Sequence, residues 1–176
     1  GRDASVRYRP ELVEELSAAE RAERLERQRA LTSLRVLARA IDAKDSSTRQ
    51  HSERVAELAV RLARAAGWPS SRVDSLREAA LVHDVGKIGV PDAILLKPGR
   101  LDDAEREAMR GHAALGAQMV EDVLRPEQVA WIRHHHERPD GGGYPDGLAG
   151  DAIPDGSRLL ALAVPAALLG GAYLGQ

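Results

Sequence analysis

A histidine and an aspartate stand side by side at the end of an apolar stretch, Leu81-Val-His-Asp-Val-Gly-Lys87. Such a pair offers a neutral imidazole nitrogen and a carboxylate, and one carboxylate can bridge two cations. Lys87 follows within one helical turn of the pair, where it suits an anionic ligand held near those cations. A salt bridge from Lys87 to Asp84 is the simpler alternative. The heptapeptide therefore indicates a metal site with room for an anion beside it.

The chain has six histidines, and each lies at or beside a predicted helix end or loop junction: His51, His83, His112, His134, His135 and His136. A lone histidine is more often structural than a ligand, but this grouping, with Asp84 next to one member, favours a metal centre. The chain has no cysteine, so a metal would be held by nitrogen and oxygen ligands. That ligand set accepts iron, manganese or zinc.

The composition indicates one helical domain. The 176 residues include 43% hydrophobic, 30% charged and only 3% aromatic residues, with no Phe. Abundant Ala and Leu favour close-packed helices over a sheet. The formal net charge of −2 gives no electrostatic case for binding DNA or RNA. We find no signal peptide and no apolar run long enough to span a membrane, so a cytoplasmic setting is expected.

A long helix is predicted from Glu11 to about Ala43, because Ala, Glu, Arg and Leu dominate and no Gly or Pro follows Pro10. Its first half is mostly polar, whereas the second half carries apolar residues from Leu31 to Ile41 that can dock on a core. The polar half is interpreted as a solvated helix face, as a connector to an upstream sensory domain, or as a dimer-forming helix. A strict heptad repeat does not hold through it, which weakens the coiled-coil interpretation.

Shorter helices are predicted to follow, each bounded by capping residues or by Gly and Pro. The first is capped within 45–48, starts near His51 and ends at Gly67-Trp-Pro69, and the next is capped by Ser70 or Ser71 and runs to His83-Asp84. A third helix runs from Asp102 or Asp103 to near Arg110-Gly111, and a fourth opens at His112. The last two run from Pro126 to His134 and from near Ser157 onward. Loops are expected at 88–92 and 137–157, the second being rich in Gly and Pro.

Taken in order, these motifs resemble the HD-GYP branch of the HD phosphohydrolase superfamily. The matching phrases are His51-Ser-Glu-Arg-Val55, His83-Asp84-Val-Gly-Lys87, Pro91-Asp-Ala-Ile-Leu-Leu-Lys-Pro-Gly99, His112, and His135-His-Glu-Arg-Pro-Asp-Gly-Gly-Gly-Tyr-Pro-Asp-Gly147. The resemblance runs from about Leu31 to Ala163. It implies an all-α, compact helical bundle of the HD-domain type with a long N-terminal helix, in which 1–30 form a tail and connector helix and 31–176 the domain.

The same resemblance implies a metal-dependent phosphodiesterase that hydrolyses the bacterial signalling messenger cyclic di-GMP. By position, the implied metal ligands are His51, His83, Asp84, His112, His135 and His136, with Asp84 bridging. Lys87 is the implied active-site lysine and, with Asp84, a catalytic residue, whereas Tyr144 lies beside the substrate. His134 falls outside the pattern. Iron or manganese is expected, with zinc or nickel as alternatives, and Ser47 stands where trinuclear members carry a glutamate, which favours one or two ions.

The sequence departs from the family pattern near its end. Val164 stands where the last metal-binding aspartate belongs, and Ala167 where a second aspartate would be. Tyr173 and Gln176 fall roughly where a basic cluster that holds substrate phosphates is expected, and the domain is expected to be C-terminally short. Three hypotheses follow: a working phosphodiesterase, a catalytically degenerate domain that acts as a metal-binding, nucleotide-binding or protein-interaction module, and a plain helical scaffold.

Overall fold

The structure is a computed structural model that describes residues 10–44 and 51–173. These residues form seven α-helices, two short 3₁₀ helices and no strand, so the predicted all-α class is confirmed. The elements are α1 Pro10–Lys44, α2 His51–Ala65, α3 Ser70–Val82, η1 Val85–Gly89, α4 Asp92–Leu95, α5 Asp103–Val120, α6 Pro126–Arg133, η2 Gly150–Ala152 and α7 Asp155–Tyr173.

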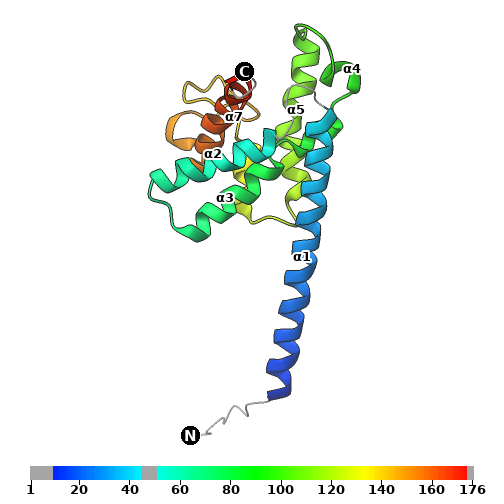
Figure 1. Ribbon diagram of the computed structural model, residues 1–176, viewed down its shortest axis with the longest axis vertical. Helices are drawn as coiled ribbons and strands as arrows, with labels where there is room; N and C mark the ends of the chain where they lie inside the picture. The colour runs from blue at the N-terminus through cyan, green and yellow to red at the C-terminus, as the bar shows by residue number, and fades with distance from the viewer. Residues whose placement is uncertain (1–9, 45–50, 174–176) are drawn as a thin grey trace, which may run out of the picture.

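Helix α1 extends far beyond the other helices as a stalk (Figure 1). Its 35 residues are continuous, which confirms the long helix predicted from the sequence. Leu31, Ala38 and Ile41 are buried, whereas the described residues before them are exposed or only half-buried. The C-terminal half of α1 therefore belongs to the bundle.

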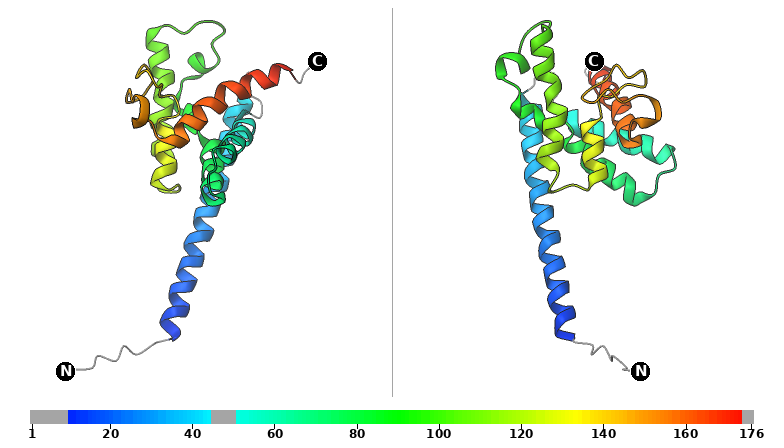
Figure 2. Two further views of the ribbon diagram at one scale, coloured as in Figure 1. Left: turned by 90° about the vertical axis from the view of Figure 1, so that its left-hand side faces the viewer. Right: turned by 180° about the vertical axis from the view of Figure 1, so that it is seen from behind.

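The bundle is built around a helical core of aliphatic residues and one tryptophan. Helix α2 packs against α3 and α7, while α5 packs against η1 and α6 (Figure 2). Trp131, Leu76 and Leu160 are fully buried where these helices meet. Burial of such large side chains is the main source of stability in a domain of this size.

A close approach between η1 and α5 brings the His-Asp pair to its partners. A Cβ atom on Gly86 would lie 2.1 Å from the backbone oxygen of His112 and 2.4 Å from the backbone nitrogen of Gly116. Only glycine fits at this position, because any side chain would push the two backbones apart. Gly86 thus sets the distance between the end of α3 and the middle of α5.

One predicted boundary is wrong in a way that matters for the site. The sequence predicted one helix ending near Arg110-Gly111 and a second opening at His112, but α5 runs unbroken from Asp103 to Val120. A capping box formed by Asp102 and Glu105 starts it. A glycine inside a helix costs only about 1 kcal/mol, which the packed flanks of α5 outweigh. His112 therefore lies within a helix and not at a junction.

Smaller differences concern the helix ends. Helix α3 begins after Pro69 without a side-chain cap, so neither Ser70 nor Ser71 acts as predicted. Part of the loop expected at 88–92 is the 3₁₀ turn η1, and α7 begins at Asp155. The caps expected within 45–48, including Ser47, and the terminal Gln176 lie outside the described residues.

Within the described part of the chain, none of the helices combines the length and apolar character needed to cross a bilayer.

Candidate metal centre

Four separate segments bring histidines to one point beside Asp84. His51 is the first residue of α2, His112 lies within α5, and the pair His83-Asp84 follows the last turn of α3. Asp84 has left the helical conformation, with φ −97° and ψ 7°, so its side chain can point to the same place as that of His83. His135 and His136 follow α6 in the same manner.

The side chains form two groups that share Asp84. One group contains Asp84, His112, His135 and His136, and the other contains His51, His83 and Asp84, with the ligand atoms of each group within 4.8 Å of one another. All six residues predicted as metal ligands are thus brought together.

The two carboxylate oxygens of Asp84 face different neighbours. Oδ1 lies 3.3 Å from Nε2 of His112 and 3.9 Å from Nε2 of His135. Oδ2 lies 3.4 Å from Nε2 of His83 and accepts a hydrogen bond from Nζ of Lys87 at 2.7 Å. A carboxylate placed in this way can serve one cation with each oxygen.

Backbone carbonyls orient three of the imidazoles. Nδ1 of His83, His112 and His135 lies 2.8, 2.7 and 2.6 Å from the carbonyl oxygen three residues earlier in each case. A carbonyl only accepts, so each Nδ1 carries the proton and each Nε2 is left with a free lone pair in the neutral ring. This is the arrangement by which proteins fix histidines as metal ligands.

Two buried imidazole nitrogens have no hydrogen-bond partner. They are Nδ1 of His51 and Nε2 of His83, and both residues are almost completely inaccessible, with 1% and 0% exposure. An unpaired buried polar atom is costly unless something satisfies it. Both residues belong to the group of His51, His83 and Asp84, so a divalent metal fits this donor set.

Burial sets the protonation of the cluster. It lowers the pKa of His51 to about 4 and that of His136 to about 3, and it holds the pKa of His135 well below its ordinary value. For Asp84 burial is the largest influence and favours the neutral acid, but the neighbouring His83, His112 and Lys87 together outweigh it, so the pKa lies well below the ordinary value. Conversely, Asp84 raises the pKa of His83 against the effect of burial. Neutral imidazoles and an ionised carboxylate are the forms that bind metals.

Tyr144 lies against the cluster on the solvent side. Its ring stacks on that of His136 with centroids 4.7 Å apart and an interplanar angle of 22°, and it meets the edge of His112 at 6.3 Å. Burial raises the pKa of Tyr144, so the phenol stays protonated. The residue predicted to lie beside a substrate is therefore next to the histidines.

A cavity of about 420 Å³ opens beside this ring. Its lining includes His135 and His136, and α7 contributes Ala161, Val164 and Pro165. Helix α7 thus presents aliphatic side chains to the cavity. The complete lining comprises Arg110, His135, His136, Glu137, Arg138, Gly142, Gly143, Tyr144, Ala161, Val164 and Pro165.

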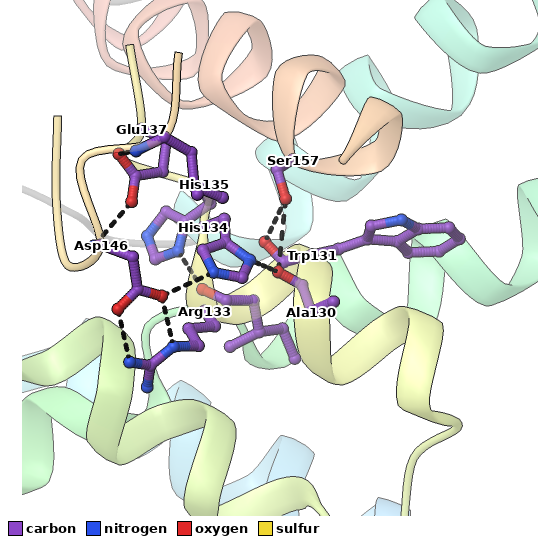
Figure 3. A network of polar contacts seen from close by, with 10 residues as sticks. Ala130, Trp131, Arg133, His134, His135, Glu137, Asp146 and Ser157 are labelled. Carbon is purple, nitrogen blue, oxygen red and sulfur yellow. Dashed lines mark hydrogen bonds and ion pairs between the residues drawn. The ribbon is translucent and has the colours of Figure 1, made fainter. Parts of the chain in front are cut away.

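Glu137 and Asp146 hold the loop that carries Tyr144, and the sequence analysis assigned neither a role. The buried carboxylate of Glu137 accepts hydrogen bonds from the backbone N–H groups of Asp146 and Leu148 at 2.8 and 3.0 Å. Asp146 in turn binds Arg133 and His134, each at 2.8 Å (Figure 3). His134 therefore contacts the loop and belongs to neither metal-ligand group. In the sequence, the one clue that Glu137 is buried was its position between two segments predicted to form the site.

Asp42 is a third residue whose role was not predicted from the sequence. It is buried near the end of α1, and its Oδ2 accepts a hydrogen bond from the backbone N–H of Ser52 at 3.0 Å. Burial raises its pKa. Asp42 thus fixes the start of α2, where His51 lies.

Comparison with known proteins agrees with this geometry. The family model for the HD domain matches residues 35–165. The chain belongs to the HD domain family. This match and the relatives below confirm the predicted HD-GYP/HD superfamily membership, whereas the division at residue 31 stays a prediction.

Curated relatives of this HD domain are bacterial phosphodiesterases. It is 40% identical over 162 residues to the cyclic di-GMP phosphodiesterase response regulator RpfG of Xanthomonas campestris pv. campestris, covering 90% of this chain and 42% of the relative. It is 40% identical over 129 residues to the 3'3'-cGAMP-specific phosphodiesterase 1 of Vibrio cholerae, covering 73% and 30%. The cyclic di-GMP phosphodiesterase of Thermotoga maritima is 40% identical over 125 residues, covering 68% and 33%. The chain thus spans less than half the length of these relatives.

Proposed function

We propose that this HD domain is a metal-dependent phosphodiesterase that hydrolyses cyclic di-GMP. The observation that carries the proposal is the pair of His/Asp groups that share Asp84. The names of the relatives support a cyclic dinucleotide as the substrate class, because they are phosphodiesterases of cyclic di-GMP or of 3'3'-cGAMP.

In this proposal His51, His83 and Asp84 hold one metal, and Asp84, His112, His135 and His136 hold the other. A bound metal pair would supply Lewis-acid stabilisation of the phosphodiester and would lower the pKa of a water. Iron or manganese suits the nitrogen and oxygen donors, with zinc or nickel as alternatives. The absence of a glutamate at Ser47 is an argument from the sequence for no more than two ions.

The remaining residues act on the substrate. Lys87 has its ammonium 2.7 Å from Asp84, so it can stabilise negative charge that develops on a phosphate at the centre. Tyr144 offers a protonated hydroxyl that can donate a hydrogen bond to the substrate. The carbonyl contacts of His83, His112 and His135 keep the rings in place while charge changes at the centre.

The test combines metal content with turnover. Purified chain is loaded anaerobically with Fe²⁺ or with Mn²⁺, its metal content is measured, and it is incubated with cyclic di-GMP. Linear dinucleotide or mononucleotide, separated by chromatography, is the expected product. The Asp84→Asn variant should give none, and the exposed Asp122→Asn variant should match wild type. If the metal-loaded wild-type chain forms no product, the phosphodiesterase proposal is rejected. The alternative is then a catalytically degenerate signalling module, which the relatives do not favour.

The exposed half of α1 fits the sequence-based expectation of a connector to an upstream sensory domain or a surface for a dimer partner. Both remain part of the proposal. The cytoplasmic location expected from the sequence likewise remains a prediction.

A further inference from the structure

Arg110 is a cation at the cavity that the proposed chemistry leaves unused. It lies on α5 two residues before His112 and lines the cavity beside Tyr144. Its Cζ atom lies 5.3 Å from the centroid of the Tyr144 ring, and that ring stacks on His136. The tyrosine ring thus connects the guanidinium with the metal-ligand cluster.

The other cations near the cavity are already paired. Arg138 donates to Asp140 through Nε at 3.1 Å and through Nη2 at 2.7 Å. Lys87 donates to Asp84. The ion-pair contact of Arg110 within the described residues is with Glu107 at 3.8 Å, which is too long for a hydrogen bond. Both partners are exposed, at 49% and 79%, so this contact neutralises Arg110 weakly.

A cyclic dinucleotide needs such a cation. It carries two phosphodiester groups, and hydrolysis requires one of them to lie at the His/Asp centre. The other phosphodiester remains charged in the cavity, where the α7 wall of Ala161, Val164 and Pro165 provides no compensation.

We propose that Arg110 forms a second phosphate subsite, which holds the phosphodiester that is not at the metal centre. This inference rests on the proposed function. The planar guanidinium can stack on Tyr144 while its N–H groups bind a phosphate through two parallel hydrogen bonds. Arg110 is then a substrate-binding residue, and its loss impairs binding without touching the metal ligands.

The first experiment compares substrates with two phosphates and one phosphate. Manganese-loaded wild type, Arg110→Ala and Arg110→Lys are assayed with cyclic di-GMP and with bis(p-nitrophenyl) phosphate, which has a single phosphodiester. Arg110→Ala should raise KM for cyclic di-GMP roughly tenfold to hundredfold, the effect of losing a charge-assisted hydrogen bond. Its kcat/KM for bis(p-nitrophenyl) phosphate should stay within about twofold, and Arg110→Lys should recover part of the lost affinity.

Arg61→Ala is the matched control, because Arg61 is an exposed arginine on α2 away from the cavity lining. It should match wild type with both substrates. An unchanged KM for cyclic di-GMP in Arg110→Ala would overturn the subsite and leave the enzyme proposal intact.

Equilibrium binding separates this inference from the proposed activity. Calorimetric titration of the same manganese-loaded proteins with slowly hydrolysed phosphorothioate analogues of cyclic di-GMP and of cyclic di-AMP should show a weaker Kd for both ligands in Arg110→Ala, because both carry the same two phosphates. A loss confined to cyclic di-GMP would show a contact with guanine and overturn the phosphate subsite. If the wild-type chain is inactive but its binding still depends on Arg110, the proposed enzymatic activity is rejected and the phosphate subsite is supported. If the wild-type chain binds neither ligand, the phosphate subsite is rejected.

Discussion

Asp84 connects the two halves of the cluster, because each of its oxygens faces a different group of histidines. A substitution of any one histidine removes a donor from one group, whereas substitution of Asp84 removes a donor from both. The residue is also buried, with 5% of its surface exposed.

Replacement of Asp84 or His83 should therefore remove metal from the protein. We expect Asp84→Ala to fall from about two metals per chain, the number that two shared sites would hold, to background. His83→Ala should lose the metal of its own group and retain about one per chain. Metal analysis after gel filtration provides the measurement, with the exposed Asp122→Ala as the control. Unchanged metal content in both variants would exclude the assigned site.

Val164 offers a gain-of-function test of whether position 164 can supply a metal ligand. It lines the cavity beside His135 and His136, so an aspartate there would add a carboxylate next to that group. We expect Val164→Asp to tighten binding of the second metal by about tenfold and to raise turnover of cyclic di-GMP, since an anionic ligand stabilises a divalent ion. Metal titration is the readout, and Val164→Asn, which has a similar shape without the charge, should show little gain. Equal metal affinity in wild type and Val164→Asp would rule out this position as a ligand site.

The distance between η1 and α5 determines whether Asp84 can reach His112. Gly86 makes that distance possible, because its missing side chain leaves room for the backbone of His112 and Gly116. The packing is therefore as important to the site as the ligands themselves.

Gly86→Ala and Gly111→Ala form a matched pair that tests this packing. The added methyl group at Gly86 should cost roughly 1–3 kcal/mol of unfolding free energy through overpacking, and it should also weaken metal binding. Gly111 lies in α5, next to His112, and its Cβ position is surrounded by open space. Alanine there should stabilise by roughly 0.5–1 kcal/mol. Urea unfolding measures both, and equal stabilities of the two variants would contradict the tight contact.

The loop that carries Tyr144 depends on Glu137. Its two backbone hydrogen bonds are made by a buried carboxylate, at 3% exposure. We expect Glu137→Ala to cost about 1–3 kcal/mol, because two backbone donors lose their partner. It should also speed amide exchange at Asp146 and Leu148, which hydrogen exchange detects. Exchange that remains as slow as in wild type would show that the loop is held by other contacts.

Local patterns in the sequence predicted the all-α class. The resemblance to a family predicted the six residues that the structure brings together in two groups, and their role as metal ligands stays a prediction. Apolar periodicity predicted most of the helices, and the order of the motifs predicted the family to which the chain belongs. The continuity of α5 through Gly111 was not predictable from local rules, because packing on both sides of that glycine outweighs its low helix propensity. The roles of Glu137, Asp42 and Arg110 depend on contacts between distant segments, which local patterns do not report.

The stalk can be tested by removing it. A chain that starts at Arg27 keeps Leu31, the first buried residue among those described in α1, and the contact of Arg27 Nε with the carbonyl of Val123 at 2.8 Å. We expect its unfolding midpoint to stay within about 3 °C of the full chain, since residues 18–26 of the deleted part are exposed. Differential scanning calorimetry measures this, and light scattering of both chains shows whether the deleted half forms a dimer. A drop of 10 °C or more would place the domain boundary earlier than residue 31.

The bond from Asp42 to Ser52 has a mechanical consequence. Helix α1 is continuous from the stalk to Asp42, and Asp42 fixes the backbone one residue after His51. If the stalk rotated about its own axis and moved Asp42, the backbone beside His51 would move as well. The position of the His51 imidazole in the cluster would therefore change. By thermodynamic linkage, metal occupancy would bias the orientation of the stalk to the same extent as the stalk biases metal affinity.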